Sequence, residues 1–261
     1  METKNKELEG LFARLEDLKR RAVRGDLGIS AFLSPAELHH GSGALSRSGC
    51  HFFSFGGYAE AERQRIYVLP DYMENAESIE KLSEFGFSSG IAVLRAQGSG
   101  FENLSHRTFM GSILGLGIER SVIGDIVMTD DNSALVFCDE AISDFLLAHW
   151  ERAGKDRIKL SRTSVSGDFC PHRSFLAIND TVASARLDCV VGALCSLSRE
   201  RAREAVVSRL VELDYECEER PDREVKAPCV ISVRGYGKFR VVALSDKTRK
   251  GRYRLQGEKF L

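Results

Sequence analysis

The first 73 residues show helical and strand-like spacings of apolar side chains in turn. Leucines at helical spacing predict an amphipathic helix over residues 6–24, with Gly25 as its stop. Ser34 opens a capping box with proline at the first helical position, which predicts a second, shorter helix. Apolar runs at 51–57 and 63–69 read as two strands around a glycine-containing loop. The pattern therefore predicts an N-terminal α/β domain.

Residues 74–165 predict a second domain in which helices and strands follow a recognisable order. Ser105 is the expected cap of the first crossover helix, which should end at Gly117. The order βαββαβ is that of the ferredoxin-like, RRM-like split βαβ fold. The aromatic strand motif with which RRM domains stack bases is absent. The elements are expected as a leading helix at 74–85, strands at 91–96, 123–129, 134–139 and 156–162, and helices at 105–117 and 139–154.

Residues 182–261 predict a third domain, so the whole chain is expected to have an α+β fold. A short helix turns Val190, Val191 and Leu194 inward, and Ser198 caps a second helix. The exposed side of that second helix carries Arg199 and Arg203 one turn apart. Strands follow, and the period of two places Lys238 and Arg240 on one sheet face. The second helix is expected to bury Ala202, Ala205, Val206, Leu210 and Leu213.

Composition removes several classes of protein. With 43% hydrophobic and 29% charged residues, the chain should fold. No apolar run approaches about 20 residues, and the charged start METKNKELEG lacks the apolar core of a signal peptide, so a cytoplasmic protein without membrane insertion is expected. Seven cysteines without a CxxC pair, and no glycine-rich phosphate loop, indicate neither disulfides, nor a metal, nor a cofactor.

Charge is segregated along the chain. Residues 1–181 carry 20 Lys+Arg and 26 Asp+Glu, whereas residues 182–261 carry 17 and 12. Within the tail, residues 231–261 hold nine basic groups and two acidic ones. A basic terminal segment is typical of a surface that binds a polyanion such as RNA, although a solvated charged tail has the same composition.

Several stretches carry a resemblance to known proteins. The run ARLDCVVGALCSLSRERAREAVV, followed by VISVRGYGKFRV, resembles the RNA-binding module first described in ribosomal protein S-four. FGGYAEAER with RQRIYVLPDY, and SHRTFMGSILGLGIERSVIGDI, are similar to the YlmH family of bacterial proteins. That family resemblance implies a non-enzymatic, cytoplasmic protein of translation that binds rRNA and tRNA on the large ribosomal subunit. Its implied role is ribosome-associated quality control of stalled peptidyl-tRNA.

The resemblance also implies which residues face RNA. Arg186, Ser198, Arg199 and Arg203 map onto the helical pair of the module, with Lys238 and Arg240 on the flanking strand. Guanidinium groups suit this task because they bind phosphates bidentately and stack on bases. The full set of expected RNA-binding residues adds Arg201, Lys247, Arg249, Lys250 and Arg252, with His106 and Arg107, at the start of a capped helix, as a second contact.

The chain departs from the module at three turns. Where the module has a glycine after the second helix, an Asn-Gly turn and a Gly-Asp, this chain has Arg209, Asp214-Tyr215 and Ala227-Pro228. The effect of these changes on turn geometry is open at the level of sequence. None of these changes falls in the second helix, which carries Arg199 and Arg203.

Two other functions remain open at this point. Arg-Leu-Asp also surrounds the catalytic aspartate of some pseudouridine synthases, so Asp188 could serve an RNA-modifying enzyme. The same family has also been linked to cell division, which suggests an adaptor for division proteins. We expect a monomer in which Asp188 pairs with arginine rather than catalyses.

Overall fold

The computed structural model describes residues 2–130, 132–171, 175–247 and 251–260. The chain divides into two compact units, Met1–Pro171 and His172–Leu261. The first unit contains two of the sequence-predicted regions, each with its own sheet, and the second contains the basic C-terminal region.

The N-terminal region of the first unit has the predicted helices and strands. Ser34 caps α2: its Oγ accepts from the Glu37 N–H at 3.3 Å, and its own N–H donates to Glu37 Oε2 at 2.8 Å. A two-residue strand after the first helix was not predicted, because it is too short to show a period. The elements are α1 (Glu2–Val23), β1 (Gly28–Ile29), α2 (Pro35–Arg47), β2 (Phe52–Phe55), β3 (Arg65–Val68), a 3-10 turn (Asp71–Met73) and α3 (Ile79–Glu84), with sheet order β1-β3-β2.

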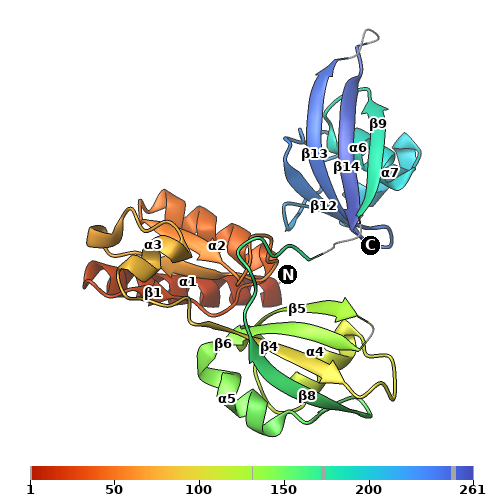
Figure 1. Ribbon diagram of the computed structural model, residues 1–261. Coiled ribbons are helices and arrows are strands. Elements are labelled where there is room, and N and C mark those ends of the chain that lie inside the picture. The colour runs from red at the N-terminus through yellow and green to blue at the C-terminus, as the bar shows by residue number, and fades with distance from the viewer. Residues whose placement is uncertain (1, 131, 172–174, 248–250, 261) are drawn as a thin grey trace. The chain divides into compact units, whose positions relative to one another are not determined.

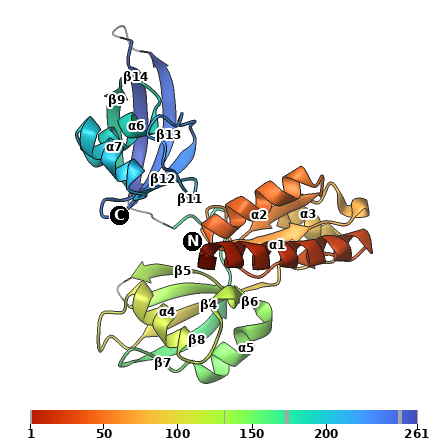
Figure 2. The ribbon, with the colours of Figure 1, turned by 180° about the vertical axis from the view of Figure 1, so that it is seen from behind.

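The middle region has the predicted βαββαβ order. Its strands are all antiparallel in the order β5-β6-β4-β8, with β7 added at the edge beyond β8. Helices α4 and α5 pack against one face of this sheet (Figures 1 and 2). This is the ferredoxin-like arrangement. The elements are β4 (Ile91–Gly98), α4 (His106–Leu114), a 3-10 turn (Arg120–Val122), β5 (Ile123–Asp130), β6 (Ser133–Asp139), α5 (Glu140–His149), β7 (Arg152–Ala153) and β8 (Asp156–Thr163).

Three helices in this unit are shorter than predicted. Helix α4 ends at Leu114 rather than at Gly117, because the amides of Leu116 and Gly117 donate to carbonyls three residues back instead of four. The helix predicted over 74–85 covers only the six residues of α3. The helix predicted to reach residue 154 ends at His149, and the chain then forms edge strand β7.

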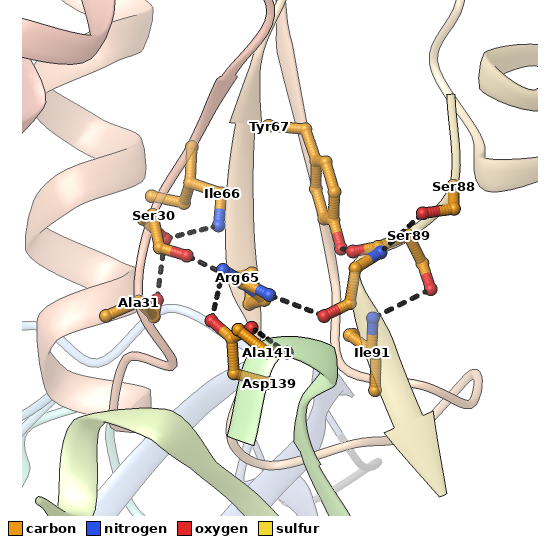
Figure 3. Close-up of polar contacts among 11 residues, drawn as sticks. Ser30, Ala31, Arg65, Ile66, Tyr67, Ser88, Ser89, Ile91, Asp139 and Ala141 are labelled. Atoms are coloured by element: carbon orange, nitrogen blue, oxygen red, sulfur yellow. Dashed lines mark hydrogen bonds and ion pairs between the residues drawn. The ribbon is translucent and has the colours of Figure 1, made fainter. Parts of the chain in front are cut away.

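The two regions of the first unit are joined by arginines that the sequence did not single out. Arg65, 7% exposed, donates to the Ser30 carbonyl at 2.7 Å and to the Gly90 carbonyl at 2.8 Å, and pairs with Asp139 at 3.0 Å (Figure 3). Asp139 also caps α5 by accepting from the Ala141 N–H. One side chain thus ties β1 to the starts of β4 and α5.

The two stretches that carry the family resemblance in this unit meet at a second junction. The Tyr58 hydroxyl donates to Asp125 at 2.6 Å, and the backbone N–H of Arg63 donates to the same carboxylate at 3.0 Å. The Arg63 guanidinium donates to the carbonyls of Ile123 and Phe32 at 3.0 and 2.8 Å. These motifs therefore hold the two regions together.

The second unit is a six-stranded antiparallel sheet with two helices on one face (Figure 1). Strand β9 (Phe175–Val182) lies almost entirely between the predicted second and third domains, where no element was predicted, and it pairs with β14 along its whole length. The other elements are α6 (Leu187–Cys195), α7 (Arg199–Val207), β10 (Val211–Leu213), β11 (Glu216–Cys217), β12 (Cys229–Val233), β13 (Gly237–Lys247) and β14 (Tyr253–Phe260), in the order β11-β10-β12-β13-β14-β9.

The core of this unit lies between the helices and the sheet. Val190, Val191 and Leu194 face inward as predicted. Helix α7 buries Ala202, Ala205 and Val206 but ends at Val207, so the expectation that Leu210 and Leu213 continue its buried stripe was wrong. Leu210 is 36% exposed after the helix, and Leu213 belongs to strand β10.

Candidate nucleic-acid interface

Helices α6 and α7 begin close to one another and set the positions of the main arginines. Arg186 is the residue that precedes α6, and Arg199 is the first residue of α7. Ser198 caps α7, and its Oγ accepts from the Arg201 N–H at 3.3 Å. The helix start thus fixes the backbone of Arg199 and gives Ser198 a structural role, while Arg203 follows one turn later on the exposed side.

Asp188 lies buried beneath these arginines, with only 1% of its surface exposed. Its Oδ1 accepts from Arg186 Nε at 3.1 Å and its Oδ2 from Arg186 Nη2 at 3.0 Å, which is the bidentate geometry. Arg199 Nε lies 3.7 Å from Oδ2. Burial works to raise the pKa of Asp188, but the hydrogen bonds from Arg186 and Cys189 outweigh it and hold that pKa below its ordinary value.

The two arginines nevertheless remain accessible, because the Arg186 and Arg199 side chains are 40% and 69% exposed. They line a surface hollow of about 630 Å³ together with Arg203. Asp188 forms its floor, and Glu200 and Asp222 also line it. Three arginines and three acidic residues line the hollow, which favours the oriented, fork-like binding of individual phosphates over attraction by a uniform positive field.

A second hollow of about 320 Å³ lies on the other side of Arg199 and shares Asp188 with the first. Arg252, from the loop before β14, lines it, and its Nε donates to Thr181 Oγ1 at 2.9 Å. Asp180 and Thr181 of β9 also contribute. This contribution of β9 was not predicted, because its apolar residues Phe175, Leu176, Ile178 and Val182 do not alternate with polar ones. The structure thus brings Arg186, Arg199, Arg203 and Arg252 together.

Lys238 and Arg240 lie elsewhere in this unit. They flank Phe239, which is buried beneath the helices, so they share the opposite face of the sheet. Arg240 is paired with Glu258 at 2.6 Å, and the Lys238 ammonium lies 5.0 Å from the centre of the Phe260 ring. Arg201 is exposed on α7. Arg249, Lys250 and the Lys247 side chain fall outside the described residues.

His106 and Arg107 belong to the first unit, at the start of α4, and both are exposed. Partial burial, with a smaller effect of the Arg120 charge, lowers the pKa of His106. Burial together with neighbouring Arg63 lowers the pKa of Arg120 to about 10. The lowered pKa favours the neutral imidazole, which weakens the attraction of His106 for a phosphate.

The turns at which the sequence departs from the module keep a glycine-like backbone. Arg209, Asp214 and Tyr215 have φ angles of 61°, 47° and 69°, all in the left-handed region. Leu213 pairs with Glu216, so Asp214 and Tyr215 form a two-residue hairpin turn that needs positive φ at both positions. Ala227 and Pro228 are joined by a cis peptide bond. Arg209, Asp214 and Tyr215 thus adopt a left-handed conformation that favours glycine or asparagine.

Among the described residues, no group of three or more His, Cys, Asp or Glu side chains could hold a metal ion. The helices in the described part of the chain are all too short or too polar to span a membrane.

Two models of one protein family match this chain, over more than half of its length together. "YlmH, N-terminal" matches residues 8–73, and "Putative RNA-binding domain in YlmH" matches residues 91–167. A protein of Bacillus subtilis (strain 168), "Ribosome-associated protein quality control protein P2", is 28% identical over 231 residues, covering 88% of this chain and 86% of that protein. The solved "Cell division protein ylmH from Streptococcus pneumoniae" is 20% identical, covers 60% of this chain and 91% of its own, and superposes with a TM-score of 0.47.

Proposed function

This chain belongs to the YlmH family, and from that premise we propose that it is a non-enzymatic RNA-binding protein of the ribosome. It binds structured rRNA of the large subunit together with tRNA, in the cytoplasm, and acts in quality control of stalled peptidyl-tRNA complexes. The ribosomal association is supported by the relative named for ribosome-associated quality control.

The observation that carries this proposal is the pair of arginines held by Asp188. Arg186 and Arg199 come from the starts of two different helices, and one buried carboxylate orients both. Arginines fixed in this way lose little side-chain freedom on binding, so two adjacent phosphates of a folded RNA can be gripped in a set geometry. Arg203 and Arg252 extend the cationic surface on either side.

The second unit acts in this proposal as an S-four-type module. Its support is the helical pair α6 and α7 packed on an antiparallel sheet, with Arg-Leu-Asp at the start of the first helix. The left-handed backbone at Arg209, Asp214 and Tyr215 adds support, because these are positions at which the module has glycine or an Asn-Gly turn.

A catalytic role for Asp188 is the weaker reading. Both of its oxygens already accept hydrogen bonds, and 1% exposure leaves no room for a substrate atom beside them. An aspartate that attacks a base must reach it directly. Its contacts are those of a positioning residue.

The proposal is tested by sedimentation of the full-length protein with intact ribosomes, separated subunits and stalled complexes at two salt concentrations. The wild type should migrate with large subunits, and Arg186→Ala/Arg199→Ala should remain at the top of the gradient. The matched control is Arg220→Ala/Arg223→Ala, which removes two arginines that lie near Glu218 outside the hollow. Equal migration of all three proteins, or none by the wild type, contradicts the proposal.

A further inference from the structure

The middle sheet has an outer face, defined here as the face turned away from α4 and α5, and this face has two unlike halves. Ala92, Leu94 and Ala96 of β4 pack beneath the helices, so the alternate residues of β4 point outward. RRM domains bind RNA on the corresponding face with exposed aromatic side chains. This chain can bind RNA in the same way only if aromatic side chains on this face are exposed.

One half of the outer face is covered by other parts of the first unit. Phe137 of β6 is fully buried, with its ring centre 5.0 Å from that of Tyr58 and 6.4 Å from that of Phe169. Tyr58 comes from the loop after β2, and Phe169 follows β8. The aromatic residue at the centre of the sheet is therefore unavailable for stacking on a base.

The other half of the outer face is basic and exposed. Arg157 and Lys159 alternate along β8 and share one face, and Lys159 lies opposite Gln97 of β4, two residues from Arg95. Arg152 of edge strand β7 lies directly opposite Arg157. All four cationic side chains are exposed. They form the surface called here the β7–β8 basic face: Arg95, Arg152, Arg157 and Lys159.

This face is not neutralised within the described part of the chain. No ion pair joins any of its four members to a described carboxylate, whereas neighbouring Arg162 is paired with Asp144 at 2.7 Å. Asp156 in the same hairpin is buried and accepts from Ser99 and Gly100 instead. Asp130 is the acid near Arg95. Its pKa is lowered first by the Asn132 N–H, and the Arg95 charge is the smallest contribution.

The arrangement costs stability in the free protein. Like charges directly opposite each other on neighbouring strands repel, and the Arg152–Arg157 pair has this placement. The face is basic although the preceding residues 1–150 are acidic overall, with 14 Lys+Arg and 22 Asp+Glu. A bound polyanion would relieve the repulsion.

We propose that the β7–β8 basic face binds the phosphodiester backbone of structured RNA. This inference rests on the proposed function and deepens it. Residues 91–167 match a putative RNA-binding domain, and the inference names the surface of that domain that contacts RNA and the phosphate backbone as what it contacts. Four exposed cations on one face of a sheet suit backbone phosphates, and the burial of Phe137 excludes base stacking on that ring. The contact is therefore sensitive to RNA shape and salt, and indifferent to base identity.

The test measures binding of the full-length protein to a 20-base-pair RNA duplex and to purified large-subunit rRNA across a salt series. Arg157→Gln/Lys159→Gln should lower the slope of log affinity against log salt by about two, and the affinity at low salt by about tenfold. The control Arg24→Gln/Lys81→Gln removes two exposed charges of the same unit outside this face and should match the wild type. Because Arg157→Gln relieves a repulsion, the urea midpoint should hold or rise, which separates lost binding from unfolding.

The outcomes are distinguishable. Unchanged RNA binding by Arg157→Gln/Lys159→Gln, with weakened binding by Arg186→Ala/Arg199→Ala, overturns this inference and leaves the proposed function standing. Unchanged RNA binding with weaker migration on large subunits assigns the face to an acidic protein, which also overturns it. Failure of the wild type to bind either RNA overturns the proposed function and this inference together.

Discussion

Asp188 and Arg186 form a bidentate ion pair across a single intervening residue, with the carboxylate 1% exposed and the guanidinium 40% exposed. The carboxylate is buried at the start of α6, so the pair fixes the helix start and the arginine at once. Asp188, the inner partner, stabilises the fold, and the guanidinium of Arg186, the outer partner, remains partly exposed to solvent.

Replacement of the inner partner should therefore weaken both folding and RNA binding. Asp188→Asn keeps the shape but loses the charge that receives the guanidinium, so we expect a loss of about 1–2 kcal/mol in the free energy of unfolding. RNA affinity should fall because Arg186 and Arg199 are no longer oriented. Urea unfolding and RNA titration measure the two effects. Asp222→Asn, at an exposed carboxylate of the same hollow, should change stability by less than about 0.5 kcal/mol.

His106 should make stability fall with acidity. Its folded-state pKa is lowered, mainly by partial burial, so the unfolded chain takes up the proton more readily as pH falls below the unfolded value of about 6.5. Above that pH both states are neutral at this residue, and no contribution is expected. His106→Gln should therefore flatten the decline in unfolding free energy between pH 7 and pH 5. If the wild type and this variant decline in parallel, while His149→Gln alters the slope, the assignment to His106 is wrong.

Replacement of Arg209 by glycine should stabilise the fold. Its φ of 61° is unfavourable for a residue with a Cβ, and the ion pair with Glu219 that it would lose joins two side chains about half exposed. Arg209→Gly should raise the free energy of unfolding by about 0.5–1 kcal/mol. The matched control is Arg203→Gly within α7, which should lower it by about 1 kcal/mol. Equal destabilisation by both substitutions would show that the positive φ of residue 209 does not make glycine favourable there.

Local chemistry explains why some elements could be predicted from the sequence. Ser34, Ser105 and Ser198 all cap the helices assigned to them, because a cap depends on residues within one turn. The Asp188–Arg186 pair is equally local. The hollow around Arg199 was predictable in part for this reason. Arg186 belongs to the short Arg-Leu-Asp motif, and Arg199 and Arg203 follow the Ser198 cap.

Long-range pairing explains what could not be predicted. Strand β9 is defined by its pairing with β14, more than 70 residues later. It begins with four apolar residues and continues with three polar ones, so it lacks the alternation that would mark a strand. Arg252 joins Arg199 only because this pairing brings the two chain segments together. The roles of Arg63 and Arg65 were not predicted, because only the packing of the two regions places their guanidinium groups against buried carbonyls.

Arg65 offers the sharpest test of how the first unit is assembled. Its guanidinium serves three acceptors on different segments, Ser30, Gly90 and Asp139, and its plane lies 5.5 Å from the centre of the Phe32 ring. Lysine carries the charge but cannot reach three acceptors in a planar fork, and it would leave buried carbonyls without a donor.

Arg65→Lys should therefore lower the free energy of unfolding of the first unit by about 2–3 kcal/mol. Arg162→Lys is the control, because its pair with Asp144 is exposed and should contribute less than about 0.5 kcal/mol. Hydrogen exchange measures the effect at individual amides. Those of β1 and of the first turn of α5 should lose protection together in Arg65→Lys, because one side chain contacts both segments. Loss of protection in only one of them would mean that Arg65 does not couple the two regions.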